Sequence, residues 1–186
     1  YVQLPMPAST SFSSNVARLV LLTAGRFNPE MYERVLWQQP EYKQAVKILR
    51  LGQYDLIHAN DWMALPVAAS AAQGTQTRIL FDAHEYSPAQ FDQYFTGRYL
   101  KSQYYEYILR TYSRNVSATV TVSAGIADLY KKNFGWEATV VRNAPEYSQV
   151  DFHPTAIKTI RLVHHGAALL RLALLGRGHQ VRRHRV

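Results

Sequence analysis

Short apolar runs alternate along the chain with longer segments whose apolar residues recur every three or four positions. The short runs predict buried strands, and the longer segments predict helices packed beside them. This alternation predicts parallel βαβ units with right-handed crossovers, and therefore an α/β fold with a Rossmann-like parallel sheet flanked by helices. The expected strands are 55–59, 78–82, 117–122, 138–141 and 160–164, and the clearest expected helices are 41–51, 65–73, 98–114 and 124–134.

The amino-terminal part of the chain is less regular. Residues 1–15 are rich in Ser and Pro, which is typical of a loop. Residues 16–23 (VARLVLLT) are almost continuously apolar, so they fit either a buried strand or a helix. Asn28, Pro29 and Glu30 together predict the start of a helix.

Polar side chains follow two neighbouring strands of the expected sheet. Ile79, Leu80 and Phe81 form a continuous apolar run, as in a strand covered by helices on both faces. In open α/β sheets, ligands collect just beyond the carboxyl ends of such strands. The two strand ends therefore predict the two walls of one crevice. One wall carries Asp82, His84 and Glu85, and the other carries His58, Asn60 and Asp61.

Three interpretations of these side chains stay open at this point. They are simple caps of strands and helices, or a metal site of a hydrolase that uses His58, Asp61, Asp82 and His84, or a site for sugars. Sugars are bound by many directional hydrogen bonds, which His, Asn, Asp and Glu supply. The sequence has no G-x-G-x-x-G, no phosphate-binding P-loop, no G-x-S-x-G and no H-E-x-x-H.

Composition narrows the class of protein. The net charge is +8, but five arginines lie in the last sixteen positions, and the rest of the chain carries only +3. That basic tail has no aromatic residue on which a base would stack, so we expect no nucleic-acid partner.

The absence of cysteine fits a reducing compartment, and we expect a cytoplasmic location. No apolar run reaches the length of about 18 residues that crosses a bilayer.

Four short motifs in a fixed order resemble a known family. They are YDLIHANDW (54–62), FDAHE (81–85), ATVTVS (118–123) and VVRNAP (140–145). This set is similar to the N-terminal domain of retaining glycosyltransferases of family 4, which have the GT-B fold, over about residues 41–168. The resemblance implies two Rossmann-like domains that face a cleft. The N-terminal domain would receive a carbohydrate or glycolipid acceptor, and the other would hold a nucleotide-sugar donor. Transfer would need no metal or other cofactor. Peripheral contact of the protein with a membrane would also be compatible with the resemblance.

The resemblance also implies roles for single residues. His84 matches the cleft histidine that lies close to the transferred sugar, and we expect it to be the catalytic residue. For Ser123 and Asn143, capping of a helix or loop is an equally good interpretation. The expected substrate-binding residues are His58, Asn60, Asp61, Glu85, Ser123 and Asn143.

The expected domain organisation has three parts. Residues 1–150 would form the acceptor-side domain, and residues 151–168 would form a linker and the start of the donor domain. Residues 169–186 form a basic Arg/Leu/His tail that fits neither the family nor a normal domain end, which suggests truncation or a frame change near Ala168. Since half of the cleft would then be missing, we expect the chain alone to be inactive in transfer. A metal-dependent hydrolase and a non-catalytic α/β binding module are the alternatives.

Overall fold

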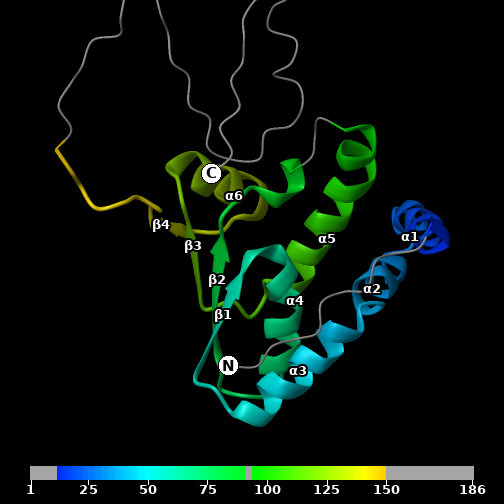
Figure 1. Ribbon diagram of the computed structural model, residues 1–186, viewed down its shortest axis with the longest axis horizontal. Helices are drawn as coiled ribbons and strands as arrows, with labels where there is room; N and C mark the ends of the chain where they lie inside the picture. The colour runs from blue at the N-terminus through cyan, green and yellow to red at the C-terminus, as the bar shows by residue number, and fades with distance from the viewer. Residues whose placement is uncertain (1–11, 91–93, 150–186) are drawn as a thin grey trace, which may run out of the picture. The chain divides into compact units, whose positions relative to one another are not determined.

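The computed structural model describes residues 12–90 and 94–149 of the 186. The chain divides after Ala144 into two units, and all the helices and strands described here lie in the first (Figure 1). No helix of the described part is both long enough and apolar enough to cross a bilayer. The expected boundaries at 150 and 168, the strand at 160–164 and the basic tail lie outside the described residues and stay predictions.

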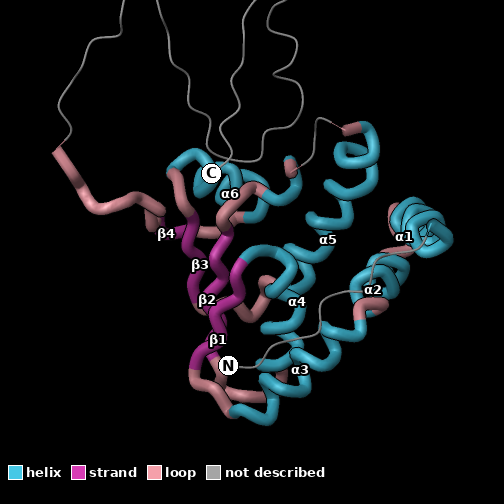
Figure 2. Tube along the Cα trace, in the orientation of Figure 1, coloured by secondary structure: helices cyan, strands magenta, loops and turns pink. Residues whose placement is uncertain are grey.

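A four-stranded parallel sheet forms the centre of the fold. Its strands are β1 (Leu56–Asn60), β2 (Arg78–Ala83), β3 (Ala118–Thr121) and β4 (Ala138–Val140). They are hydrogen-bonded in the order β1-β2-β3-β4. Figure 2 shows them as neighbouring magenta segments with helices in the connections. The prediction of an α/β, Rossmann-like parallel sheet is confirmed.

Six α-helices surround or extend this sheet. The helix expected to begin at Asn28–Glu30 is present, and the helix expected at 98–114 is α5 with a preceding π-helical turn, η2. A short 3₁₀ turn, η1, follows β2. The bounds are α1 (Phe12–Ala24), α2 (Glu30–Trp37), α3 (Pro40–Gly52), α4 (Asp61–Ala72), η1 (Ser87–Ala89), η2 (Gly97–Lys101), α5 (Ser102–Tyr112) and α6 (Ala124–Phe134).

Two expectations about helices need correction. The run 16–23 is part of α1, so the strand alternative is wrong, and the loop expected for residues 1–15 is wrong for 12–15. Helix α4 begins at Asp61, four residues before the expected start, so Pro66 lies inside it rather than in its first turn. The early start is favoured because Trp62 is buried and its backbone N–H donates to the Asp61 carboxylate.

The hydrophobic core lies on one face of the sheet. Ile57 and Ala59 of β1 and Ile79 and Phe81 of β2 are buried there, in one cluster with residues of α4, α5 and α6. A single face is expected, because right-handed crossovers that always advance in the same direction place their helices on the same side. Figure 1 shows α4 and α5 on one side of β1 and β2.

The opposite face of the sheet has a different character. Leu56, His58 and Asn60 of β1 are exposed, and Leu80 and Asp82 of β2 are half-buried. The expectation that β2 is covered by helices on both faces is therefore wrong for the described residues. The side chains alternate between a dry face and a more polar face, which is the pattern of a sheet with one open side.

A polar network joins α2 to α5 at the periphery of the core. The Glu33 carboxylate accepts hydrogen bonds from Trp37 Nε1 (2.9 Å), Tyr107 OH (2.8 Å) and Tyr112 OH (2.7 Å). Burial and the hydrogen bond to Glu33 raise the pKa of Tyr107 to about 12 and also raise the pKa of Tyr112. Both phenols therefore hold their protons more tightly in the folded chain than in water.

Candidate functional site

The carboxyl ends of β1 and β2 meet at one edge of the sheet. In the parallel register Asn60 lies beside Asp82, and His58 lies two positions earlier beside Leu80. Side chains two residues apart on a strand share a face. The register therefore places His58, Asn60 and Asp82 on the same open face, away from the core.

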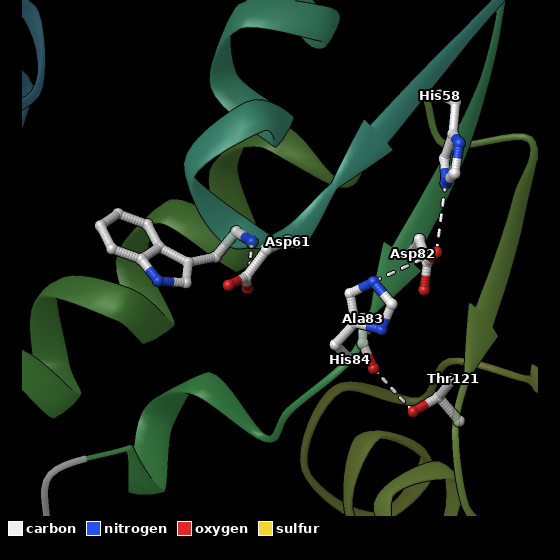
Figure 3. Close-up of polar contacts among 7 residues, drawn as sticks. His58, Asp61, Asp82, Ala83, His84 and Thr121 are labelled. Atoms are coloured by element: carbon white, nitrogen blue, oxygen red, sulfur yellow. Dashed lines mark hydrogen bonds and ion pairs between the residues drawn. The ribbon is translucent and has the colours of Figure 1, made fainter. Parts of the chain in front are cut away.

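Asp82 lies between two histidines on this face. His58 Nε2 is 3.2 Å from Asp82 Oδ2, and His84 Nε2 is 3.5 Å from the same oxygen. The Asp82 side chain is only 17% exposed, whereas His58 and His84 are 51% and 41% exposed. Figure 3 shows the two rings converging on the carboxylate from opposite sides. The carboxylate is thus covered by two imidazoles whose other edges face solvent.

This arrangement has a chemical consequence for the histidines. A carboxylate only accepts hydrogen bonds, so a neutral His58 ring that hydrogen-bonds Asp82 must do so with an Nε2–H. The proton is then absent from Nδ1, which becomes an acceptor. A hydrogen bond to one ring nitrogen sets the tautomer in this way. Asp82 therefore prepares His58 to accept a hydrogen bond from a hydroxyl group at Nδ1, and His84 lies at ion-pair distance from the same carboxylate.

Buried hydrogen bonds fix the backbone that carries His84. Thr121 Oγ1 of β3 donates to the carbonyl of Ala83 (2.7 Å, Figure 3), directly before His84. Tyr130 OH of α6 donates to the carbonyl of Glu85 (2.8 Å), directly after it. Both side chains are buried, so the residue before His84 and the residue after it are each held from a neighbouring element. His84 lies directly after β2, in a segment that β3 and α6 anchor on both sides.

Asp61 stands apart from this trio. It has a left-handed backbone with φ of +66°, and its carboxylate accepts the Trp62 N–H at 2.6 Å. Figure 3 shows it at the head of α4, away from Asp82. A non-glycine residue in this region costs of order 1–3 kcal/mol, and such residues concentrate at functional sites. Its conformation is fixed by its own helix rather than by the histidines.

The other predicted residues have separate environments. Asn60 is exposed at the end of β1, and Asn143 is exposed in the segment after β4. The carboxylate of Glu85 accepts a hydrogen bond from Gln90 Nε2 at 2.8 Å. Ser123 accepts the Ile126 N–H at 3.3 Å and so caps α6. The structure thus brings His58 and His84 together through Asp82.

The described residues offer little support for a metal centre or an enclosed pocket at this edge. No group of three or more His, Asp or Glu side chains among them has the arrangement of a metal site. A hollow of about 410 Å³ lies instead near the amino end of β1, where Arg50, Tyr54 and Thr77 contribute to its wall. At the carboxyl edge the His58 and His84 side chains are 51% and 41% exposed, and such a polar surface suits a large polar ligand better than a small apolar one.

Comparison with known families shows the family of this domain. The family model described as Glycosyltransferase Family 4 matches residues 9–145. The chain belongs to glycosyltransferase family 4. The match extends further toward the amino terminus than the resemblance at 41–168, and it ends at the last of the four motifs. Searches of the curated proteins and of the solved structures gave no significant match.

Three residues of this family 4 domain escaped the sequence-based choice of site residues. Asp82 was considered as part of the crevice but not as a substrate-binding residue, although its carboxylate lies 3.2 Å from His58 Nε2 and 3.5 Å from His84 Nε2. Thr121 and Tyr130 were expected to be part of a strand and a helix, and their hydrogen bonds span 38 and 45 positions. The position of Asp82 at a strand end could have identified it from the sequence, whereas no signal in the sequence identifies Thr121 or Tyr130.

Proposed function

We propose that this domain supplies the acceptor-side wall of a retaining glycosyltransferase that moves a hexosyl unit from a nucleotide sugar to a carbohydrate or glycolipid acceptor. The observation that carries the proposal is the pair of histidines on either side of the Asp82 carboxylate at the carboxyl edge of a family 4 domain. A nucleotide-sugar donor would be bound by a facing domain, in accordance with the GT-B fold. The location would be cytoplasmic, where nucleotide sugars are made.

His84 would be the catalytic residue of this wall. Its Nδ1 would accept a hydrogen bond from a sugar hydroxyl and hold the acceptor oxygen close to the anomeric carbon. Holding two reactants in such a geometry lowers the barrier because their relative motion is already restricted. The rigid backbone around His84, fixed by Thr121 and Tyr130, supports this role.

The remaining predicted residues would contribute binding. His58 and Asn60 share the open face with Asp82 and would hydrogen-bond the acceptor ring. Asp61 and Glu85 would orient hydroxyl groups at the rim, and Ser123 and Asn143 would border the cleft. For Ser123 the hydrogen bond to Ile126 N supports a capping role beside any contact with substrate.

Histidine ring resonances give a direct test of acceptor binding. The chain has seven histidines, so the C–H signals of His58 and His84 can be assigned from single His→Ala variants. We expect these two signals to move when oligosaccharides or methyl hexosides are added, while the other five stay in place. An Asp82→Asn variant should weaken the saccharide affinity several-fold, since the amide no longer enforces the tautomer of the His58 ring.

The matched control is Asp128→Asn, which removes the same charge from an exposed position on α6. The acceptor-side assignment fails if no saccharide moves either signal, or if the two Asp→Asn variants behave alike. Sugar transfer is a separate readout. We propose that the 186-residue chain alone transfers no sugar, and a hexosyl mass gain on an oligosaccharide incubated with a nucleotide hexose would contradict that.

A further inference from the structure

The hollow near the amino end of β1 is separate from the candidate site, and we call it the amino-edge hollow. Its volume is about 410 Å³, and its lining residues come from 49–57 and 71–77. Small-molecule sites in proteins have volumes of roughly 300–1,000 Å³. Strand β1 runs from Leu56 to Asn60, a length of about 13 Å at ~3.3 Å per residue. The hollow and Asp82, which lies beside Asn60, are therefore at opposite edges of the sheet.

An aromatic ring is fixed in one wall of the amino-edge hollow. The Tyr54 ring lies so close to the backbone of Gly52 that a Cβ at position 52 would overlap it. Gln53, between them, has a left-handed backbone with φ of +47°, a conformation that ends helices. Tyr54 is still 47% exposed. Gly52 thus supports one side of the ring, and the remainder offers an apolar surface beside a polar hydroxyl group.

Two hydrogen bonds hold the walls of this hollow together. The Arg50 guanidinium, near the end of α3, donates to the carbonyl of Ser70 in α4 at 2.8 Å. Thr77 Oγ1, directly before β2, donates to the carbonyl of Tyr54 at 2.7 Å. These contacts join segments that are 20 and 23 positions apart in the sequence. Walls that are fixed before binding lower the entropic cost of binding, so the hollow is prepared for a ligand.

Three polar side chains of the lining are free to meet a ligand. The side chains of Gln53, Asp55 and Gln76 make no hydrogen bond or ion pair within the part of the chain that the structure describes. An amide supplies both donors and acceptors, and a carboxylate supplies acceptors. Leu49 and Ile57 add apolar surface to the lining. Such a surface is complementary to a sugar ring, which has C–H faces and a rim of hydroxyl groups.

The charge of the hollow disfavours an anionic ligand. Arg50 is the one basic residue of the lining, and Asp55 is the one acidic residue. Helix α3 ends at Gly52 and α4 ends at Ala72, so two helices have their carboxyl ends at this edge. A helix carries about half a negative charge at its carboxyl end. A phosphate or a nucleotide would therefore be repelled, whereas a neutral polar ligand would not.

We propose that the amino-edge hollow binds a neutral pyranose sugar, which packs on the Tyr54 ring and hydrogen-bonds Gln53, Asp55 and Gln76. This is a saccharide site in addition to the one proposed at the histidines, and it holds a glycan at a point remote from the reacting sugar. The proposal rests on the side chains of the hollow alone, so it does not depend on the transfer reaction.

Backbone amide NMR spectra of the 186-residue chain test this binding. The probes are methyl glucoside, methyl galactoside and methyl mannoside, with inorganic phosphate as the anionic comparison. We expect at least one hexoside to shift the amide signals of residues 53–55 and 74–77 in a saturable way, and phosphate to leave them in place. No shift with any hexoside, or a shift with phosphate alone, would overturn the proposal.

Removal of the aromatic ring tests its contribution. Tyr54→Ala should weaken hexoside binding at least about fivefold, because the sugar loses the apolar surface on which it packs. Amide signals that keep their positions outside the hollow show that the variant is folded. The matched control is Tyr147→Ala, which removes a ring that is 92% exposed and does not line the hollow, and it should bind like the unaltered chain. Equal losses in the two variants would contradict the proposal.

Gly52→Ala displaces the ring without removing it. The added Cβ takes the place of the Tyr54 ring, which is exposed enough to turn away. We expect a loss of hexoside affinity close to that of Tyr54→Ala. Gly125→Ala is the matched control, since nothing lies within 4 Å of a Cβ there, and it should keep full affinity. The proposed role of the ring is refuted if Gly52→Ala binds the hexoside as tightly as Gly125→Ala.

A variant at the other edge separates this site from the histidines. His58→Ala should leave the hexoside shifts at 53–55 and 74–77 unchanged, and their loss in this variant would count against a separate site. Failure of sugars to move the His58 and His84 ring signals would contradict the acceptor-side wall alone, because the two sites are read from different resonances.

Discussion

Removal of one hydroxyl group, in Tyr130→Phe, tests whether the backbone around His84 is held from α6. The Tyr130 side chain is fully buried, and its hydroxyl donates to the Glu85 carbonyl at 2.8 Å. The same oxygen lies 3.5 Å from the Ser87 N–H, a contact too long to add much. Burial raises the pKa of Tyr130, so the phenol is neutral and remains a donor throughout the neutral range.

The expected cost follows from these contacts. A neutral hydrogen bond contributes about 1 kcal/mol net, and the Glu85 carbonyl, which loses its donor in a part-buried contact, adds a part of its desolvation penalty. We therefore expect the free energy of unfolding to fall by about 1.5 kcal/mol. For a chain of this size that corresponds to a decrease in Tm of about 3–6 °C. Ring packing is unchanged, since phenylalanine keeps the stacking on Trp136, whose centroid lies 5.2 Å away.

Urea unfolding followed by circular dichroism measures this change. Tyr147→Phe is the matched control, because it removes the same atom from a ring that is 92% exposed, and it should alter stability by less than about 0.5 kcal/mol. Amide exchange at Glu85–Ser87 should also become faster in Tyr130→Phe, as local opening becomes easier. The reasoning is refuted if Tyr130→Phe costs no more than Tyr147→Phe or leaves exchange in this segment unchanged.

Two further predictions concern α6 and the tyrosines of α5. Ser123→Ala should cost about 1 kcal/mol of stability by removing the cap of α6, and Ser123→Asp should restore it; a melt in which Asp is no better than Ala would contradict capping. Stability should also decline as the pH rises from about 10 toward 12, because the raised pKa values of Tyr107 and Tyr112 mean that the unfolded chain loses these protons first. Urea midpoints across this range check the decline, and Tyr112→Phe should make it shallower.

Local sequence patterns predicted most of the sheet because β-strands here are short apolar runs with polar ends. β1 and β2 lie within one residue of their expected positions at both ends. The patterns failed where an apolar run has no periodic interruption. Residues 16–23 contain neither a glycine nor a regular polar position, so only tertiary contacts, such as the burial of Leu22, select the helix.

The candidate site was predictable only in part for a similar reason. His58, Asp82 and His84 lie at strand ends, and polar side chains at such positions already predict a functional site from the sequence alone. Their mutual contacts depend on the register that places Asn60 beside Asp82, which no local pattern encodes. Thr121 and Tyr130 support His84 from β3 and α6, and their roles depend on pairing between segments far apart in the chain.

The open face of the sheet explains why β1 and β2 carry their chemistry inside the strands as well as after them. In a strand buried on both sides, a carboxylate at position 82 would lose its hydration, and its interactions there would not compensate for the free energy of desolvation. On this face Asp82 is half-buried beside two imidazoles, of which His58 hydrogen-bonds the carboxylate, and both rings remain 41–51% exposed to water. Alternation thus lets one strand contribute Ile79 and Phe81 to the core and Asp82 to the site. The sheet itself thus places His58 and Asp82 on the open face, with His84 directly after β2, where a ligand can reach them.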